Sequence, residues 1–111
     1  MIDLRRGDVV FYGERGEFTG KLRPGVIVQR ESTLADSPSI TVCGITSFSM
    51  PTHAARVALS PSPENGLEEQ SFAMIDKIAS ISRSRVRRVF GHLNPDEINA
   101  IDRALRSWLQ L

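Results

Sequence analysis

The sequence of 111 residues is poor in several features, and each shortage excludes a class of protein. Its single cysteine, Cys43, allows no internal disulfide and no cysteine metal cluster, which favours a reducing compartment. No apolar run approaches the roughly 18 residues that a membrane span needs, and the first six residues lack the apolar core of a secretory signal. We therefore expect a cytoplasmic protein that does not associate with a membrane.

The chain also lacks a strong net charge. Its 14 Lys and Arg residues face 13 Asp and Glu residues, which gives a formal net charge of +1 and excludes a globally polycationic binder. Only local charge segregation could attract a polyanion, and residues 83–88 are the strongest case, with four arginines and no acid. This run is either a solvated strand or turn, or part of a groove that follows phosphates.

The length fits one small domain, residues 1–111, with a single core. Apolar and β-branched runs predict strands at residues 9–12, 26–29, 40–45 and 55–59, and residues 70–81 fit one or two more. Glycine, proline and polar residues separate these runs, as is typical of turns. We predict a mainly β protein, with a small curved antiparallel sheet or SH3-like barrel capped by a C-terminal helix.

The predicted helix has the clearest start signal in the chain. Asn94 can cap it, Pro95 suits the first helical position, and the acids at 96 and 97 match the positive end of the helix dipole. Apolar residues then recur at helical spacing and form a stripe that should pack on the sheet. The stripe comprises Ile98, Ile101, Leu105, Trp108 and Leu109, while Asp102, Arg103 and Arg106 should face water.

The most informative segment is residues 21–28. Pro24 has a fixed φ angle and pushes Arg23 into an extended conformation, while residues 26–28 have the β-branched composition of a buried strand. The guanidinium of Arg23 is therefore held at the start of a strand. Its five planar donors and permanent charge suit a phosphate that gains negative charge during a reaction. Alternatively, Arg23 is a surface cation paired with a carboxylate.

Five short motifs follow one another along the chain, namely Arg6-Gly7-Asp8, Arg23-Pro24, Thr46-Ser47, Asn65-Gly66-Leu67 and Asp76-Lys77-Ile78. In their order and spacing they resemble the MazF/PemK family of bacterial toxin ribonucleases, the mRNA interferases of type II toxin–antitoxin systems. The resemblance implies a MazF/CcdB-like fold, a homodimer and an acidic, partly disordered antitoxin. It also implies cleavage of single-stranded RNA without a metal or other cofactor, by attack of the substrate 2′-hydroxyl on the adjacent phosphate.

The resemblance assigns catalysis to Arg23 together with Thr46 and Ser47, although hydroxyls at a strand end most often only cap a turn. Hydroxyl pKa values are too high for a general base near neutrality, so another group must accept the proton. Asp76 is one candidate, or it simply pairs with Lys77 or another surface cation. In some family members an arginine precedes this aspartate by two residues, where this chain has Met74.

His53 is the other candidate base, because it lies in a loop sequence similar to that of some family members and an imidazole suits proton transfer. His92, just before the helix, is expected to be structural. Aromatic residues are only 6% of the chain, so few platforms exist for base stacking. The residues expected to bind RNA are Lys21, Phe18, Phe48, Lys77, Arg83 and Arg85.

Two other functions fit the sequence. One is a CcdB-like toxin that binds DNA gyrase without nuclease activity, which relies on a tryptophan close to the C-terminus. Here Trp108 falls on the apolar stripe and three residues follow it, so we interpret it as a core residue. The other is a regulator that binds RNA without cutting it.

Overall fold

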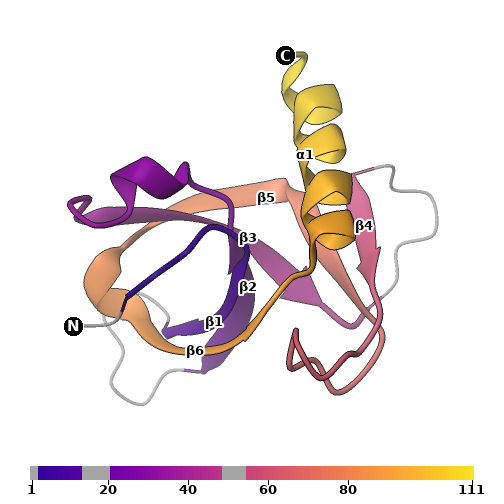
Figure 1. The fold of residues 1–111 in the computed structure, drawn as a ribbon, viewed down its shortest axis with the longest axis horizontal. Coiled ribbons are helices and arrows are strands. Elements are labelled where there is room, and N and C mark those ends of the chain that lie inside the picture. Colours follow the sequence, from indigo (N-terminus) through magenta and orange to yellow (C-terminus); the bar gives the residue numbers. More distant parts are fainter. Residues whose placement is uncertain (1–2, 14–20, 49–54) are drawn as a thin grey trace.

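The computed structural model describes residues 3–13, 21–48 and 55–111, which form six strands and one α-helix (Figure 1). Two short 3-10 helices, Glu31–Thr33 and Arg83–Arg85, lie between strands. The strands are β1 (Asp8–Gly13), β2 (Leu22–Ile27), β3 (Ser39–Thr46), β4 (Arg56–Leu59), β5 (Ser71–Ser82) and β6 (Val86–His92), and the helix is α1 (Pro95–Leu109).

All six strands belong to one antiparallel sheet in the order β4-β5-β3-β2-β1-β6. The sheet is strongly curved, and β5 and β6 sweep around one side of it in Figure 1. Its two edge strands, β4 and β6, are not paired with each other within the described residues, so the sheet is not closed. The predicted curved antiparallel sheet with a C-terminal helix is confirmed, in its open form.

The sheet buries apolar side chains on both faces, because successive residues of a strand point to opposite sides. Val9, Val26 and Cys43 are neighbours on one face, where Ile101 of α1 joins the same cluster. The cluster on the other face includes Val10, Ile27 and Val42, the chain neighbours of those three strand residues, together with Leu4, Leu34, Ile40, Ile81 and Val86. Odd and even positions of these strands therefore serve different surfaces.

β2 begins earlier than the sequence predicted. We expected a strand at residues 26–29, but β2 spans Leu22–Ile27 and includes both residues of the Arg-Pro pair. Arg23 lies opposite Tyr12 and Pro24 opposite Phe11 in the pairing with β1. The fixed φ of proline suits an extended strand, although it removes one hydrogen-bond donor.

β5 is one strand of twelve residues with a large irregularity in the middle. Between the pairs Cys43↔Ile78 and Ile45↔Ala73, β3 advances by two residues while β5 advances by five. β5 therefore carries three extra residues within positions 74–77, and such bulges bend a strand and re-aim its side chains. This bulge places Asp76 where a regular strand would not.

The start of α1 is as predicted. The side chain of Asn94 accepts a hydrogen bond from the Glu97 amide at 2.8 Å, and the Glu97 carboxylate accepts one from the Asn94 amide at 2.9 Å. Asp102 does not simply face water, since its Oδ1 lies 2.8 Å from the guanidinium of Arg6. Among the described residues, no helix is long and apolar enough to cross a membrane.

The end of α1 differs from the prediction. Ile101 is buried and Leu105 is partly buried, but Trp108 and Leu109 are 52% and 51% exposed. The expectation that these two residues belong to the core is therefore wrong. The reason is visible in Figure 1, where the C-terminal half of α1 extends past the sheet and finds no surface there to pack against.

Candidate functional site

Arg23 and Thr46 lie on neighbouring strands, and the strand register relates them directly. β2 and β3 pair as Gly25↔Gly44, Val26↔Cys43 and Ile27↔Val42. The same register carried two residues further places Arg23 opposite Thr46. Because alternate residues share a face, both side chains leave the sheet on the side of the two glycines, with backbones about 5 Å apart.

The two glycines make room for larger side chains on this face. A Cβ atom at Gly25 would lie 2.8 Å from Cε1 of Tyr12, and a Cβ atom at Gly44 would lie 2.8 Å from Cε of Met74. The Tyr12 ring and the Met74 side chain thus cover the backbone next to Arg23. Any larger residue at either glycine would push them away.

The hydroxyl of Thr46 makes the local contact that is common at strand ends. Its Oγ1 accepts a hydrogen bond from the amide of Phe48 at 3.1 Å. A hydroxyl that accepts can still donate its proton, so Thr46 can also bind an anionic oxygen. Ser47 and Phe48 are exposed beyond it, and the Phe48 side chain, 69% exposed, is presented to solvent.

Asp76 pairs with a residue that the sequence analysis missed. Its Oδ1 lies 3.2 Å from Nε of Arg56 on β4, and the two side chains are only 14% and 10% exposed. The contact angle is too oblique for a hydrogen bond between these two atoms, so this is an ion pair. Lys77, the partner suggested by the sequence, is exposed. The sequence signal that could have identified this partner of Asp76 was the lone arginine, Arg56, in the predicted strand at residues 55–59.

Two arginines of the basic run hold the backbone together. The guanidinium of Arg83 donates to the carbonyl of Leu34, and Nε of Arg85 donates to the carbonyl of Gly13 at 2.9 Å. Arg88, by contrast, is exposed and lies 5.6 Å from the centre of the Phe11 ring. The run therefore combines structural contacts with exposed charge.

The other residues that the sequence analysis singled out lie at the edge of the sheet, in its structural contacts, or outside the described residues. Lys21 is exposed next to the start of β2, and His92 is structural as expected, with Nδ1 2.7 Å from Oδ1 of the buried Asp8. Phe18 and His53 lie outside the described residues. In the part of the chain that is described, no group of three or more His, Cys, Asp or Glu side chains could hold a metal ion.

The thiol of Cys43 lies in the core beside the Arg56–Asp76 pair. The pKa of the thiol is raised from 9.0 to about 12, mainly by burial and also by the charge of Asp76, while the charge of Arg56 opposes the shift. The thiol donates to the carbonyl of Met74, 3.0 Å away, within the bulge of β5. Cys43 is therefore a protonated packing residue and not a nucleophile.

Comparison with known proteins identifies the family. The sequence pattern of the PemK-like, MazF-like toxins of type II toxin–antitoxin systems matches residues 5–109. The chain belongs to this family. A probable endoribonuclease MazF from Mycolicibacterium smegmatis is 35% identical over 106 residues, which cover 96% of each chain. Endoribonuclease EndoA from Bacillus subtilis is 28% identical and covers 97% of this chain and 96% of its own.

Solved structures agree on the fold. A MazE–MazF structure from Deinococcus radiodurans has a TM-score of 0.81 at 19% identity and covers 100% of this chain and 99% of its own. A mycobacterial endoribonuclease in complex with its cognate antitoxin has a TM-score of 0.77 at 21% identity, with 100% and 97% coverage. The fold predicted for this MazF-like toxin is thus the fold of its family.

We expect Cys43 of the native toxin to resist alkylation by iodoacetamide at mildly alkaline pH, because the thiol stays protonated up to about pH 12 and is buried. The urea-unfolded chain, whose thiol regains a pKa of about 8.5, should react fast in the same buffer. Mass spectrometry of the intact protein measures both. Rapid labelling of the folded protein would contradict the assignment.

We expect Asp76→Asn to lower the free energy of unfolding by about 3 kcal/mol, since it leaves the nearly buried Arg56 cation without its ion-pair partner. The double change Arg56→Gln with Asp76→Asn should recover a large part of this loss. Urea denaturation measures both. Asp36→Asn at an exposed turn is the control and should change stability little; an equal loss there would refute the explanation.

Proposed function

We propose that this toxin is a sequence-selective endoribonuclease that cleaves single-stranded RNA without a metal. The observation that carries the proposal is the β2–β3 register, which puts Arg23 and Thr46 on one face of the sheet. Support comes from the relatives at 35% and 28% identity, which are named as endoribonucleases. The substrate class and the chemistry below follow from what these two side chains can do.

The reaction uses the RNA's own nucleophile. The 2′-hydroxyl oxygen attacks the adjacent phosphorus, the bond from phosphorus to the 5′-oxygen breaks, and the products are a cyclic phosphate and a 5′-hydroxyl. Arg23 binds the non-bridging oxygens and stabilises the charge that they gain in the transition state. Thr46 donates a hydrogen bond to the same phosphate, whereas Ser47 lies on the other face of the strand end and lines a pocket there.

A proton leaves the 2′-hydroxyl and another reaches the departing 5′-oxygen. Asp76 and His53 are the candidates for the base. The variant Arg56→Gln with Asp76→Asn removes the carboxylate together with its buried partner charge. If Asp76 is the base, this stable double variant should cleave about 100-fold more slowly; if His53 is the base, replacing His53 should have that effect instead.

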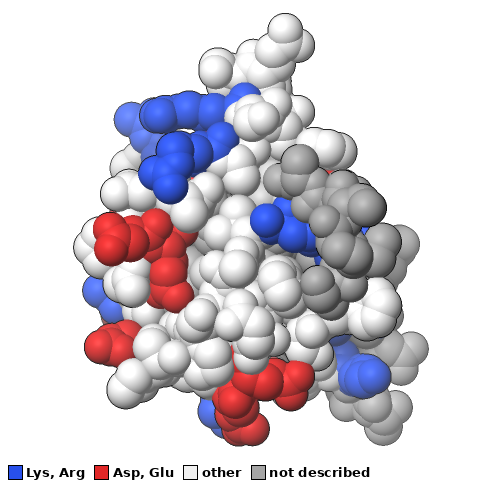
Figure 2. Space-filling view, turned by 90° about the vertical axis from the view of Figure 1, so that its right-hand side faces the viewer, with Lys and Arg blue, Asp and Glu red and all other residues white. Residues whose placement is uncertain are grey.

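Substrate RNA is proposed to lie over the exposed residues around Arg23. Lys21 and Lys77 supply exposed charge, and Phe48 supplies an exposed stacking surface. Phe18, which lies outside the described residues, remains a sequence-based candidate for a second one. Arg83 and Arg85, whose guanidinium groups each carry five N–H donors, are proposed to contact phosphates in addition to the carbonyls that they hold. On the face that Figure 2 shows, basic and acidic side chains form separate small groups.

Two protein partners are part of the proposal. The first is a second copy of the chain, seated on the apolar end of α1, where Trp108, Leu109 and Leu111 are 52%, 51% and 85% exposed. The second is an acidic antitoxin segment, as suggested by similar structures that contain an antitoxin. We place the action of the toxin in the cytoplasm, where mRNA is found. The family match does not favour the gyrase-binding alternative.

We expect Arg23→Ala to reduce RNA cleavage by at least about 100-fold while the circular dichroism spectrum stays unchanged, because Arg23 is exposed and its loss removes transition-state stabilisation. Arg23→Lys should recover only part, since an ammonium lacks the planar fork. Thr46→Val should also slow cleavage. The assay is fragment formation from a long RNA in EDTA.

Arg30→Ala, at an exposed arginine beyond the other end of β2, is the matched control and should cleave normally. Full activity of Arg23→Ala would remove the catalytic assignment. Binding of RNA by the natural protein without any fragments in EDTA or in magnesium would instead favour the RNA-binding regulator.

We expect the natural protein to be a dimer and Leu109→Arg to shift it toward the monomer, because a charge would have to be buried in an apolar contact. Ser107→Arg adds the same charge on the opposite side of the helix and should leave the dimer intact. Light scattering coupled to size-exclusion chromatography measures the mass of each. A monomeric natural protein, or equal effects of both variants, would refute this interface.

A further inference from the structure

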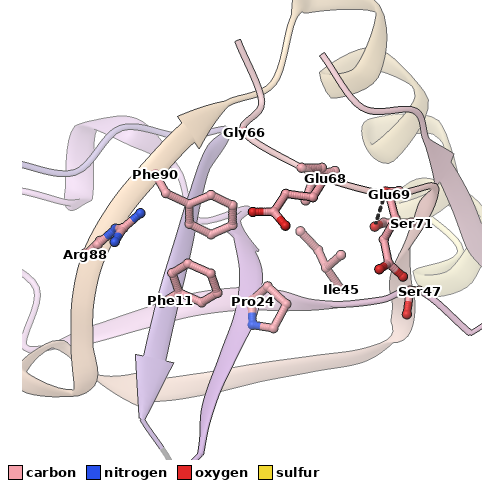
Figure 3. Close-up of a pocket in the computed structure, with 11 residues that line it drawn as sticks. Phe11, Pro24, Ile45, Ser47, Gly66, Glu68, Glu69, Ser71, Arg88 and Phe90 are labelled. Atoms are coloured by element: carbon pink, nitrogen blue, oxygen red, sulfur yellow. Dashed lines mark hydrogen bonds between the residues drawn. The ribbon is translucent and has the colours of Figure 1, made fainter. Parts of the chain in front are cut away.

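A pocket of about 330 Å³ opens at the end of the sheet, on the face opposite to Arg23 and Thr46 (Figure 3). Pro24 and Ser47, which line it, directly follow those two residues in the chain. Because neighbouring residues of a strand point to opposite faces, the pocket lies just around the strand ends from the proposed scissile phosphate. A single strand of RNA held at Arg23 can therefore turn around this end and place an adjacent base in the pocket.

The wall of the pocket suits a flat ring. The rings of Phe11 and Phe90 are stacked with centroids 4.1 Å apart and an interplanar angle of 20°. Both rings are only half-buried, so they present aromatic surface to whatever enters. The guanidinium of Arg88, 5.6 Å from the Phe11 centroid, adds a cation at the rim. Stacked aromatic groups with a nearby arginine are the usual means of holding an unstacked base.

Two carboxylates belong to the lining of the pocket. Figure 3 shows the side chain of Glu68 directed toward the Phe90 ring, with Glu69 next to it on the same wall. A carboxylate only accepts hydrogen bonds, so it can pair with the exocyclic amino group of cytosine. The corresponding atom of uracil is a carbonyl oxygen, which a carboxylate repels. The volume of about 330 Å³ is large enough for a single base.

The wall that carries Glu68 is firmly anchored. The buried Asn65 accepts hydrogen bonds from the amides of Ser62 and Leu67, both at 3.0 Å. Its amide group donates to the carbonyl of Ser60 at 2.8 Å and to the Glu97 carboxylate of α1 at 3.1 Å. The backbone of this wall, from which the exposed Glu68 side chain projects, is therefore set in place before a ligand arrives.

We propose that this pocket binds the base of a nucleotide adjacent to the cleaved bond and that Glu68 makes it select cytosine over uracil. The inference rests on the proposed ribonuclease function and adds a specificity residue to it. It predicts that uracil is excluded at one position next to the cut. Glu68→Gln should relax this exclusion, because the glutamine amide can donate to the carbonyl of uracil as well as accept from cytosine.

The test maps the 5′ ends of fragments from a randomised RNA cut by the natural protein, by Glu68→Gln and by Glu64→Gln. The last is the matched control, since Glu64 is an exposed acid of the same loop that does not line the pocket. At one position the natural protein and Glu64→Gln should prefer cytosine to uracil by about 10–100-fold, and Glu68→Gln should lose most of that preference. Phe90→Leu should raise the KM for the preferred RNA more than it lowers kcat.

A second readout does not depend on cleavage. Equilibrium binding to Arg23→Ala is compared for pentanucleotides that differ only in cytosine or uracil at each position, with and without Glu68→Gln. If Glu68→Gln shows the same preference for cytosine over uracil as the protein that keeps Glu68, in cleavage or in binding, the inference is overturned and the ribonuclease proposal still stands. Loss of the dimer in Phe90→Leu with unchanged base preference would overturn it too, and would assign the pocket to the second copy. Absence of cleavage by the natural protein would refute the proposed function alone, and the binding comparison would still decide the role of Glu68.

Discussion

The close pairing of β2 and β3 is the constraint on which the proposed site depends. Gly25 and Gly44 face each other across the two strands, and neither position has room for a Cβ atom because Tyr12 and Met74 lie over them. The pairing of the two glycines therefore determines which residues lie opposite each other where the two strands end. The paired register ends at the two glycines, and continuing it by two residues relates Arg23 to Thr46, so the course of the two backbones sets their relative position.

The alternation of side chains then divides the end of the sheet into two surfaces. Arg23 and Thr46 belong to one face, while Pro24 and Ser47 belong to the other and line the aromatic pocket. Two different tasks, charge stabilisation at a phosphate and recognition of a base, can thus be carried by adjacent residues. Short strands with both faces in use let a chain of this size present two surfaces at one edge.

The sequence predicted the features that depend on interactions between residues close together in the chain. Asn94 and Pro95 marked the start of α1, and Arg23 with Pro24 marked a cation on a rigid strand because proline restricts both residues.

The Arg56–Asp76 pair could not be predicted, since it requires β4 to lie beside the bulge of β5 and depends on a register shift that spacing does not reveal. The prediction that Trp108 is a core residue was wrong for a related reason. Periodicity shows which side of a helix is apolar, but it does not show how far the opposing sheet extends. The pocket was missed because Phe11, Glu68 and Phe90 come from distant parts of the chain.

Glu97 belongs to two structures at once. One of its oxygens closes the cap of α1, and the other holds the buried Asn65 and, through it, the loop that forms the pocket wall. The helix onset and the loop are therefore mechanically joined through a single side chain. A force that tilts α1, such as the docking of another protein on its far end, would be passed to the base-binding wall, so partner binding and nucleotide choice in this toxin need not be independent properties.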